Sequence, residues 1–286
     1  MNKKHFKKHI VIGSANFTQK YGRNKNQLKQ FQIKKILKLA KNNNIYKIDT
    51  AQAYIENKNN FIKLEKKFEF YTKIIPNSNW SSIEYCQNEL NKHFSIFNNH
   101  KVDVLFFHDV NILLNQNGHK IFNNLKELKK RNLFKKIGIS IYDPNFLSKI
   151  ISKYNVDVVQ VPFNVFDKRI IESGWYDKLK NLGIEIHARS IFLQGLLVNK
   201  LFFKKKYFRQ WKTLFLNWFK YLEKNRIPPV DYCMSDLLNY DFDKIIIGIN
   251  SHKNLKEIID FKIVKKNQMK NFTINDKNLI DPRYWK

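Results

Sequence analysis

Residues 102–140 read VDVLFFHDVNILLNQNGHKIFNNLKELKKRNLFKKIGIS, and this stretch decides the fold. Val102–His108 is a mostly apolar, partly β-branched run of the kind found in buried strands. Ile121–Leu133 repeats apolar residues three and four positions apart, which is typical of an amphipathic helix. Lys136–Ser140 is a second short apolar run. A strand, a helix and another strand in this order predict parallel pairing through a crossover helix.

The same alternation continues along the chain and gives eight candidate strands. Eight such units in 286 residues favour an α/β fold of the (β/α)₈ TIM barrel type, which needs about 250 residues. We therefore expect a single domain over residues 1–286. No Gly-x-Gly-x-x-Gly follows the first strand, which argues against an open dinucleotide-binding sheet. The candidate strands are His9–Gly13, Tyr46–Thr50, Phe68–Lys73, Val102–His108, Lys136–Ser140, Val156–Pro162, Glu185–Arg189 and Lys244–Ile249.

Helical signals fill the gaps between these strands. Asp143-Pro144 predicts a helix start, with Asp as N-cap and Pro at the first helical position, and Gly183 predicts a helix end. An extra segment between the last two strands is expected to form a loop and then a helix that ends before Pro228-Pro229. The other expected helices and the extra segment are Gln32–Leu39, Ile83–Phe97 and Phe202–Asn225.

The chain is strongly basic, with 53 Lys and Arg against 24 Asp and Glu and a formal net charge of +29. Such a charge raises the question of nucleic-acid binding. Only seven of these residues are Arg, the side chain best suited to phosphate and base recognition, and the lysines are spread over the whole length. We expect no specific nucleic-acid partner, although a positive field attracts anionic cofactors and substrates.

Cysteine content and hydropathy indicate the compartment. Cys86 and Cys233 lie far apart and have no metal-binding spacing, so we expect no metal and a reduced, cytoplasmic location. The basic N-terminal residues resemble the start of a signal peptide, but the apolar run Ile10–Ile12 is too short to complete one. No stretch approaches the about 20 apolar residues of a membrane span, so we expect no membrane association.

Four polar residues stand at or after the ends of three consecutive candidate strands. Asp49 ends the second strand and Tyr54 follows in the loop, while Lys73 ends the third and His108 the fourth. Because a barrel places its active site at the carboxyl ends of the strands, these side chains should share one rim. Each residue alone has an ordinary structural explanation, as a turn cap, a surface side chain or a strand-end histidine, and the conjunction of all four favours a site.

The four residue types suit carbonyl reduction. When a hydride reaches the carbonyl carbon, the oxygen must be protonated, and the hydroxyl of Tyr54 can supply that proton. The ammonium of Lys73 would lower the pKa of the phenol, and Asp49 would compensate the charge of the buried Lys73. An N–H of His108 could polarise the carbonyl oxygen.

At this point the sequence resembles the aldo-keto reductase family, from about Ile10 to Trp285, and most closely bacterial members associated with surface-sugar biosynthesis. The most diagnostic segment is Ile48–Tyr54. The resemblance implies NAD(P)H-dependent reduction of an aldehyde or ketone, and it identifies Asp49, Tyr54, Lys73 and His108 with the family's catalytic tetrad. The other matching segments are Ile10–Phe17, Gly138–Ser140, Gln160–Asn164, Ala188–Leu197, Ile247–Ser251 and Asn254–Glu257.

The resemblance also implies a cofactor site along the later strands. By position, two residues hold the nicotinamide carboxamide, three lie where the pyrophosphate passes, and four lie at the adenosine end. This order agrees with the tendency of barrels to bind phosphates at the loops after strands seven and eight. The three groups are Ser140 and Gln160; Ser190, Leu193 and Gly195; and Ser251, Lys253, Asn254 and Glu257.

Several positions depart from the family's pattern. Ile141 stands where many members have Asn, and Arg189 stands near the aromatic residue that stacks on nicotinamide, although a guanidinium can stack as well. Asn254 replaces the Arg that often binds a 2′-phosphate, a charge that Lys253 can supply. We therefore expect NADPH, with NADH as the alternative. Ile55 replaces the usual Gly after Tyr54.

Two other function classes remain open from the sequence. The chain could be a cofactor-binding regulatory protein with a relic active site, like the potassium-channel beta subunits of this fold, or a polyanion binder. The substrate is expected to be a small carbonyl compound, with sugar-derived aldehydes and ketones among the candidates. Four aromatic residues either line an apolar or sugar-stacking pocket or belong to the core: Trp80, Trp175, Phe163 and Phe166. The oligomeric state is not encoded in any pattern we recognise.

Overall fold

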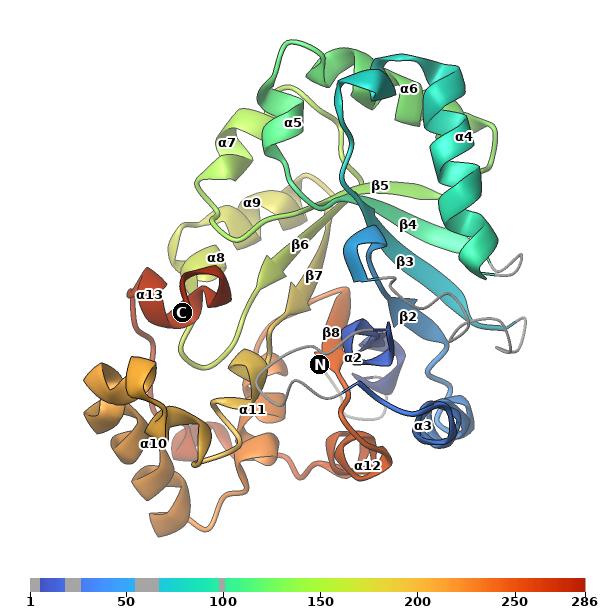
Figure 1. Cartoon of the computed structure of the whole chain (residues 1–286). Coiled ribbons are helices and arrows are strands. Elements are labelled where there is room, and N and C mark those ends of the chain that lie inside the picture. Colours follow the sequence, from blue (N-terminus) through green and yellow to red (C-terminus); the bar gives the residue numbers. More distant parts are fainter. Residues whose placement is uncertain (1–5, 19–26, 55–66, 98–100, 286) are drawn as a thin grey trace.

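A computed structural model describes residues 6–18, 27–54, 67–97 and 101–285 of the chain. Its centre is a closed barrel of eight parallel strands in chain order, β1 to β8, with β8 pairing back onto β1 (Figure 1). The predicted (β/α)₈ barrel is thus confirmed. The strands are β1 (Ile10–Gly13), β2 (Lys47–Asp49), β3 (Glu69–Ile74), β4 (Val102–Phe107), β5 (Lys136–Ser140), β6 (Val158–Pro162), β7 (Glu185–Arg189) and β8 (Lys244–Gly248).

Every predicted strand exists in the structure, and the predicted and observed bounds differ only at the strand ends. His9 belongs to a short 3-10 turn, η1 (Lys7–His9), and β3 continues one residue past Lys73. His108 lies directly after β4, although its backbone N–H still donates to the carbonyl of Ile74 at 2.9 Å. Val156 precedes β6 because its N–H turns back to Tyr154 at 3.0 Å.

Helices surround the barrel, and those long enough to be amphipathic bury their apolar stripe. In α6, the buried side chains of Ile121, Phe122, Leu125 and Leu128 follow the predicted three- and four-residue spacing. The helices are α2 (Ala15–Thr18), α3 (Gln30–Asn42), α4 (Ile83–Phe94), α5 (Asn111–Leu114), α6 (Gly118–Lys130), α7 (Phe146–Ile151), α8 (Arg169–Glu172), α9 (Trp175–Asn181), α10 (Lys212–Lys224), α11 (Pro229–Leu237), α12 (His252–Asp260) and α13 (Lys277–Ile280).

The helix predicted to start at Asp143-Pro144 begins later. The carboxylate of Asp143 accepts the N–H of Asn145 at 3.0 Å, and a turn through Pro144 precedes α7, which starts at Phe146. The Asp side chain therefore closes a turn instead of capping the helix directly. The predicted helix end at Gly183 is confirmed, since this glycine follows α9 with a φ of +68°.

The barrel interior is filled by side chains from several strands. Tyr71 and Phe106 are the largest members of this cluster, and Phe106 covers Gly138 of β5 so closely that a Cβ on that glycine would lie 2.4 Å from its ring. His187 is fully buried here and stacks on Tyr71 at 5.3 Å between ring centroids. The barrel is therefore a packed core. The other members are Val11, Val104, Val158 and Ile246.

The amino ends of the strands carry a set of paired charges. Lys47 contacts both Glu69 and Asp103 at 2.7 Å, and Lys136 contacts Glu185 at 2.5 Å. Burial alone would lower the pKa of Lys47, but these two carboxylates raise it above its ordinary value. A hydrogen bond with His187 and the nearby Lys136 bring the pKa of Glu185 down to about 2. This end of the barrel is closed by ion pairs over the packed interior.

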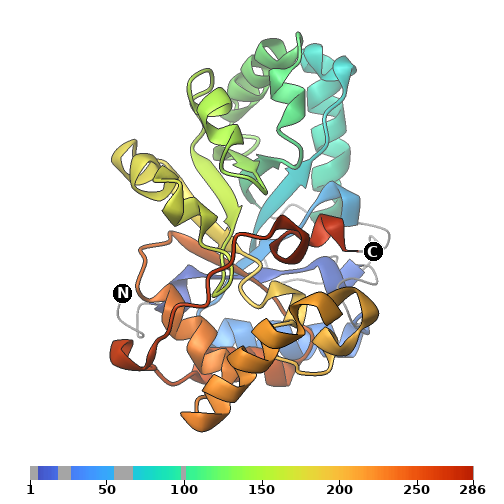
Figure 2. The ribbon, with the colours of Figure 1, turned by 90° about the vertical axis from the view of Figure 1, so that its left-hand side faces the viewer.

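The extra segment between β7 and β8 builds a second apolar cluster beside the barrel. It forms short 3-10 turns and then α10, as predicted, and the indole of Trp218 in α10 donates to the carbonyl of Leu197 at 3.0 Å. The C-terminal segment joins it, since Trp211 donates to Asp276 at 2.8 Å. Figures 1 and 2 show α10 on the opposite side of the barrel from α4 and α6.

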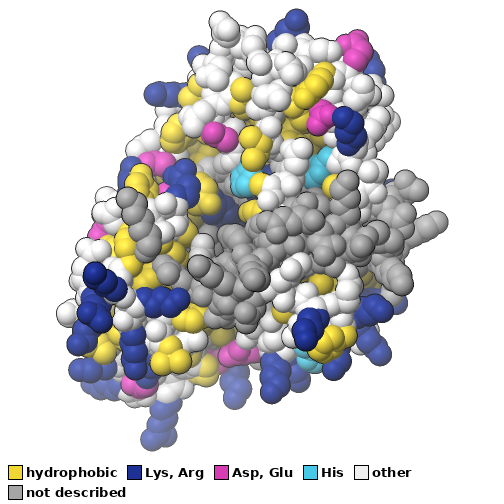
Figure 3. All heavy atoms as spheres, viewed as in Figure 1, with side chains coloured by type: hydrophobic (Ala, Val, Ile, Leu, Met, Phe, Trp, Pro, Cys, Tyr) yellow, Lys and Arg dark blue, Asp and Glu magenta, His cyan; other side chains and the backbone are white. Residues whose placement is uncertain are grey.

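Two properties of the described residues bear on the sequence predictions: the hydropathy of the helices and the distribution of the basic side chains. None of their helices combines the length and hydropathy needed to cross a membrane. On the face shown in Figure 3, Lys and Arg side chains are spread along the lower border and scattered elsewhere instead of forming one compact patch. This distribution matches the even spread of lysines along the sequence.

Candidate active site

The four polar residues that follow the early strands line one cavity of about 420 Å³. Asp49 is the last residue of β2, and Tyr54 ends the 3-10 turn η2 (Gln52–Tyr54) that follows it. Lys73 projects from β3, and His108 comes directly after β4. Parallel neighbouring strands place their carboxyl ends on one rim, and this explains why residues 49 to 108 meet here.

Lys73 and Asp49 form a buried ion pair. Their Nζ and Oδ1 atoms are 2.5 Å apart, and the two residues are 3% and 5% exposed. The ammonium also donates to the carbonyl of Thr50 at 3.2 Å. Burial lowers the pKa of Lys73, and the attraction of Asp49 opposes that change. The carboxylate is therefore what keeps a charged lysine in this desolvated position.

His108 is held in its neutral form. Burial, followed by the positive charges of Lys73 and Arg189, lowers its pKa to about 4. Its ring meets that of Tyr54 edge to face, with centroids 5.9 Å apart and planes at 87°. Its buried Nδ1 has no hydrogen-bond partner in the described part of the chain. A neutral imidazole has one N–H to donate, which suits it to a carbonyl oxygen.

Gln160 of β6 links Asp49 of β2 to Ser140 of β5 by hydrogen bonds. Its Nε2 donates to the second carboxylate oxygen of Asp49 at 2.9 Å, and its Oε1 accepts from the hydroxyl of Ser140 at 3.4 Å. The residues predicted to hold a carboxamide therefore line the same cavity as the four tetrad residues. Ile141, which replaces an Asn of the family, is buried, and its N–H donates to the carbonyl of Gln160 at 3.0 Å.

Arg189, the last residue of β7, also lines the cavity. Its guanidinium donates to the carbonyl of Ile141 at 3.0 Å and to the hydroxyl of Ser190 at 3.2 Å. The carbon at its centre lies 4.0 Å from the ring centroid of Tyr142, and that of Arg283 lies 3.9 Å from the same ring. Sequence reasoning missed Tyr142 and Arg283, because nothing in the pattern links a loop near residue 142 to the C-terminal segment.

The loop after β7 has an unusual backbone. Ser190, Leu193 and Gln194 have φ angles of +63°, +45° and +50°, and Gly195 has +94°. Non-glycine residues rarely adopt such angles, and strain of this kind gathers at binding sites. Ser190, Gln194 and Gly195 line the cavity, whereas Leu193 is buried in the apolar cluster around α10.

The start of α12 forms the opposite end of the cavity. Asn254 and Glu257 line it, while Ser251 caps the helix by accepting the N–H of Asn254 at 3.1 Å. Lys253 is exposed on the first turn and does not line the cavity. Of the residues predicted for the adenosine end, the structure therefore brings two into the cavity wall and leaves two beside it.

The aromatic residues of the cavity are not those singled out in the sequence. Trp80, Phe163 and Phe166 are buried in the core, and Trp175 packs partly buried against it. None of the four lines the cavity; the aromatic side chains that do are Tyr54, Tyr142, Phe192 and Phe202. The core explanation is thus correct for those four residues. The position of Ile55 lies outside the described residues.

The cavity fits a nicotinamide cofactor. Its wall carries buried polar atoms without a partner among the described residues, including the hydroxyl of Ser14 and the Nδ1 of His108. Gly13 and Gly248 let the β1 and β8 backbones meet so closely that a Cβ on Gly13 would lie 3.3 Å from Gly248. Phosphates bind near the last two strands of such barrels, where the strained loop and α12 stand.

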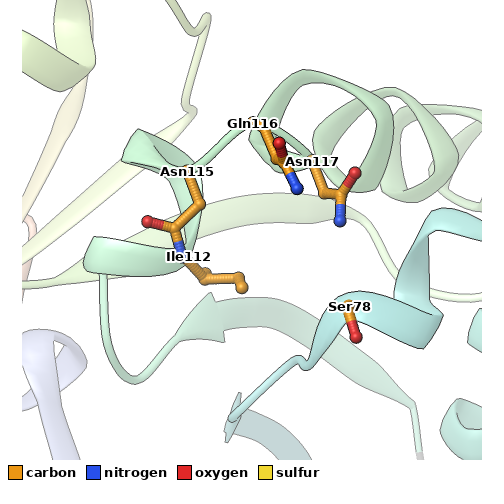
Figure 4. Close-up of a pocket in the computed structure, with 5 residues that line it drawn as sticks. All are labelled: Ser78, Ile112, Asn115, Gln116 and Asn117. Carbon is orange, nitrogen blue, oxygen red and sulfur yellow. The ribbon is translucent and has the colours of Figure 1, made fainter.

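A second pocket, of about 470 Å³, opens elsewhere on the surface (Figure 4). It is lined by Ser78, Ile112 and the consecutive amides Asn115, Gln116 and Asn117, and it contains none of the predicted site residues. No group of three or more His, Cys, Asp or Glu side chains suited to a metal occurs among the described residues. The cavity at the carboxyl ends of the strands contains the predicted residues and is therefore the candidate site.

Comparisons with known proteins agree with this geometry. The aldo-keto reductase AKR11C1 from Bacillus halodurans, in its holo form, superposes with a TM-score of 0.69 at 14% identity, over 91% of this chain and 89% of that one. The glycerol dehydrogenase AKR11B4 from Gluconobacter oxydans gives 0.66 at 15% identity, over 91% and 88%. These likenesses support the fold. No curated protein matches the sequence.

The sequence profile of the aldo/keto reductase family matches residues 9–277, which include all eight strands and the whole cavity wall. This family consists of oxidoreductases that act on small carbonyl compounds with nicotinamide cofactors. The predicted family is therefore confirmed, and the chain belongs to the aldo/keto reductase family.

Proposed function

We propose that this enzyme reduces an aldehyde or ketone, derived from a sugar or a related metabolite, with Tyr54 as the proton donor. The observation that carries the proposal is the buried Lys73–Asp49 pair beside Tyr54 and His108 in one cavity. Such a pair is costly to bury, and a folded chain that keeps it at the rim of a cavity has a use for the charge there.

We also assign the cofactor site to residues at the wall of this cavity. We assign Ser140 and Gln160 to the carboxamide of the nicotinamide, the Ser190–Gly195 loop to the pyrophosphate, and the start of α12 to the adenosine end. When bound, the reduced cofactor supplies the hydride and is left oxidised. We propose NADPH as that cofactor because Lys253, exposed on the first turn of α12, offers a cation where a 2′-phosphate would lie.

The chain's own residues then handle the proton. The N–H of neutral His108 holds the carbonyl oxygen and polarises it. As hydride adds to the carbonyl carbon, that oxygen takes the proton of the Tyr54 hydroxyl, and the alcohol forms. The ammonium of Lys73 stabilises the resulting tyrosinate by its charge, and Asp49 holds the ammonium in place. Water restores the Tyr54 proton after the product leaves.

The state of the two cysteines supports a cytoplasmic location. Cys86 and Cys233 are both buried and unpaired, which is common in proteins of a reducing compartment. We propose that location together with the function.

The test is the Tyr54→Phe variant, which removes the hydroxyl and keeps the ring. We expect turnover of carbonyl substrates to fall by about two or more powers of ten, the usual size of an acid-catalysis effect. Cofactor affinity, followed by Trp fluorescence quenching with NADPH and NADH, should stay nearly unchanged. Normal turnover in Tyr54→Phe would reject the assignment. Failure of the folded wild type to bind either cofactor would favour a regulatory protein with a relic site.

A further inference from the structure

Two basic residues, Lys73 and Arg189, line the cavity, and of these only Lys73 has a carboxylate partner among the described residues. Lys73 has Asp49 at 2.5 Å. Arg189 has no carboxylate within 4.0 Å among the residues that the structure describes, and it is only partly exposed. Arg169, a buried arginine, is by contrast paired with Asp167 at 2.7 Å. A half-buried guanidinium without an anion is an open binding position.

The guanidinium of Arg189 extends away from the strand that leads to the adenosine end. Arg189 stands on β7, between β6 and β8, yet its Nη2 donates to the carbonyl of Ile141 and its plane meets the ring of Tyr142, both beyond the end of β5. The group therefore reaches over β6 toward β5. Phosphates of a bound nucleotide are expected at the loops after strands seven and eight, and of the two hydrogen bonds of the guanidinium only the one from Nη1 to Ser190 is made with those loops.

The position of this side chain is fixed from two sides. The guanidinium carbons of Arg189 and Arg283 lie 4.0 and 3.9 Å from the ring centroid of Tyr142, so both side chains pack on this one ring. Arg283 is itself bound by Asp281, through Nε at 3.0 Å and Nη2 at 2.6 Å. The Arg283–Asp281 pair is neutral overall and supports the stack, which leaves the charge of Arg189 unmatched.

Arg189 also keeps donors free for a ligand. A guanidinium has five N–H groups, and within the described residues only the bonds to Ile141 and Ser190 use them. Its fork geometry fits two oxygens of a carboxylate or phosphate. Its charge acts on the catalytic end of the cavity, because together with burial and Lys73 it lowers the pKa of His108.

We propose that Arg189 binds a carboxylate or phosphate group on the carbonyl substrate, so that the enzyme acts on anionic aldehydes or ketones. The proposal rests on the carbonyl reduction proposed above. It assigns Arg189 as the specificity-determining residue: the anionic group meets the guanidinium over β5 and β6 while the carbonyl oxygen meets His108 and Tyr54 across the mouth.

The test uses two aldehydes of the same shape, 4-carboxybenzaldehyde and the neutral 4-carbamoylbenzaldehyde, with saturating NADPH. We expect wild-type kcat/KM to favour the carboxylate by about tenfold or more, the usual order for a charge-assisted hydrogen bond. Arg189→Met should remove that preference, so that kcat/KM falls by about tenfold more for the carboxylate than for the amide. Arg189→Lys, which keeps the charge and loses the fork, should retain part of it.

Arg209→Met is the matched control, because Arg209 is exposed on the 3-10 turn η8 (Lys206–Trp211) and lies outside the cavity wall. It should leave the preference as in the wild type. The thermal midpoint of each variant shows whether it folds. Glyceraldehyde 3-phosphate and glyceraldehyde form a second pair, which measures the preference for a phosphate. Comparison with the first pair shows whether Arg189 favours a phosphate or a carboxylate.

Three results would overturn the proposal. The first is a wild type that reduces both aldehydes equally well. The second is an Arg189→Met variant with an unchanged preference. The third is an equal loss for both aldehydes together with weaker NADPH binding, which would mean that Arg189 holds the cofactor. Reduction of neither aldehyde, nor of either glyceraldehyde, by a wild type that binds NADPH would reject the parent function and the proposal with it.

Discussion

The ion pair between Lys73 and Asp49 makes a quantitative prediction about stability. Replacing Lys73 by Met keeps the volume of the side chain and removes its charge. Asp49, 5% exposed, is then left with the amide of Gln160 at 2.9 Å as its remaining side-chain partner among the described residues. Stranding one member of a buried pair costs about 3–5 kcal/mol, so we expect Lys73→Met to lose that much in free energy of unfolding.

The cost should depend on the charge of Asp49 and not on the missing packing. In the double variant Asp49→Asn, Lys73→Met, no charge is stranded, and we expect it to recover about 2 kcal/mol relative to Lys73→Met, within the range of coupling seen between contacting residues. Neither variant should regain turnover, since both lack the ammonium beside Tyr54.

Urea unfolding at pH 7, followed by circular dichroism and Trp fluorescence, measures these differences. Matched slopes of the free energy against urea concentration would show that the same surface unfolds in each variant. The reasoning fails if Lys73→Met costs less than about 1 kcal/mol, the value of an exposed pair. It also fails if the double variant is no more stable than Lys73→Met.

Two further predictions concern buried groups away from the chemistry. His93 is 4% exposed, its Nε2 lies 2.7 Å from the hydroxyl of Thr72, and burial lowers its pKa to about 4. Because His93 binds a proton more tightly in the unfolded chain than in the folded one, about 3 kcal/mol of stability present above pH 6.5 should be lost as the pH falls through about 4. His93→Gln should remove this share of the pH dependence of urea unfolding between pH 7 and 4 and leave the share of His108, whose pKa is also about 4; an unchanged slope would contradict the prediction. Gly138→Ala should cost about 1–3 kcal/mol by overpacking, since its Cβ would lie 2.4 Å from Phe106; adding Phe106→Leu should relieve most of that loss, and thermal unfolding that shows no relief would refute the steric explanation.

The sequence was sufficient for the barrel because its evidence is local. Runs such as Lys136–Ser140 and helices such as Ile121–Leu133 carry their own periodicity, and the order of elements determines the topology. Strand ends were less certain, because pairing with a neighbour decides them. His108 looks like the last residue of a strand, yet it lies just beyond β4 while its N–H still bonds to Ile74.

That Asp49, Tyr54, Lys73 and His108 line one cavity could be predicted for a similar reason, since strand ends of a barrel share a rim. The stack of Arg189, Tyr142 and Arg283 at the edge of the cavity could not. Tyr142 and Arg283 meet over 141 positions of sequence, and neither has a neighbour pattern that points to the other. Trp80 and Phe163 show a second limit of the sequence. Both are buried in the core, but an aromatic residue in a sequence is equally compatible with a core position and with a pocket wall.

The ion pairs that close the amino ends of the strands bear on the order of events in a catalytic cycle. With Lys47 and Lys136 paired on that side, and with Tyr71, Phe106 and His187 filling the interior, the described part of the barrel offers no rear exit. Everything that reaches the tetrad must arrive and depart by the mouth above it. A molecule seated deeper must therefore enter first and leave last. Because all molecules use one opening, binding and release are ordered. Release of the last molecule, and not the chemical step, can then limit the rate of turnover.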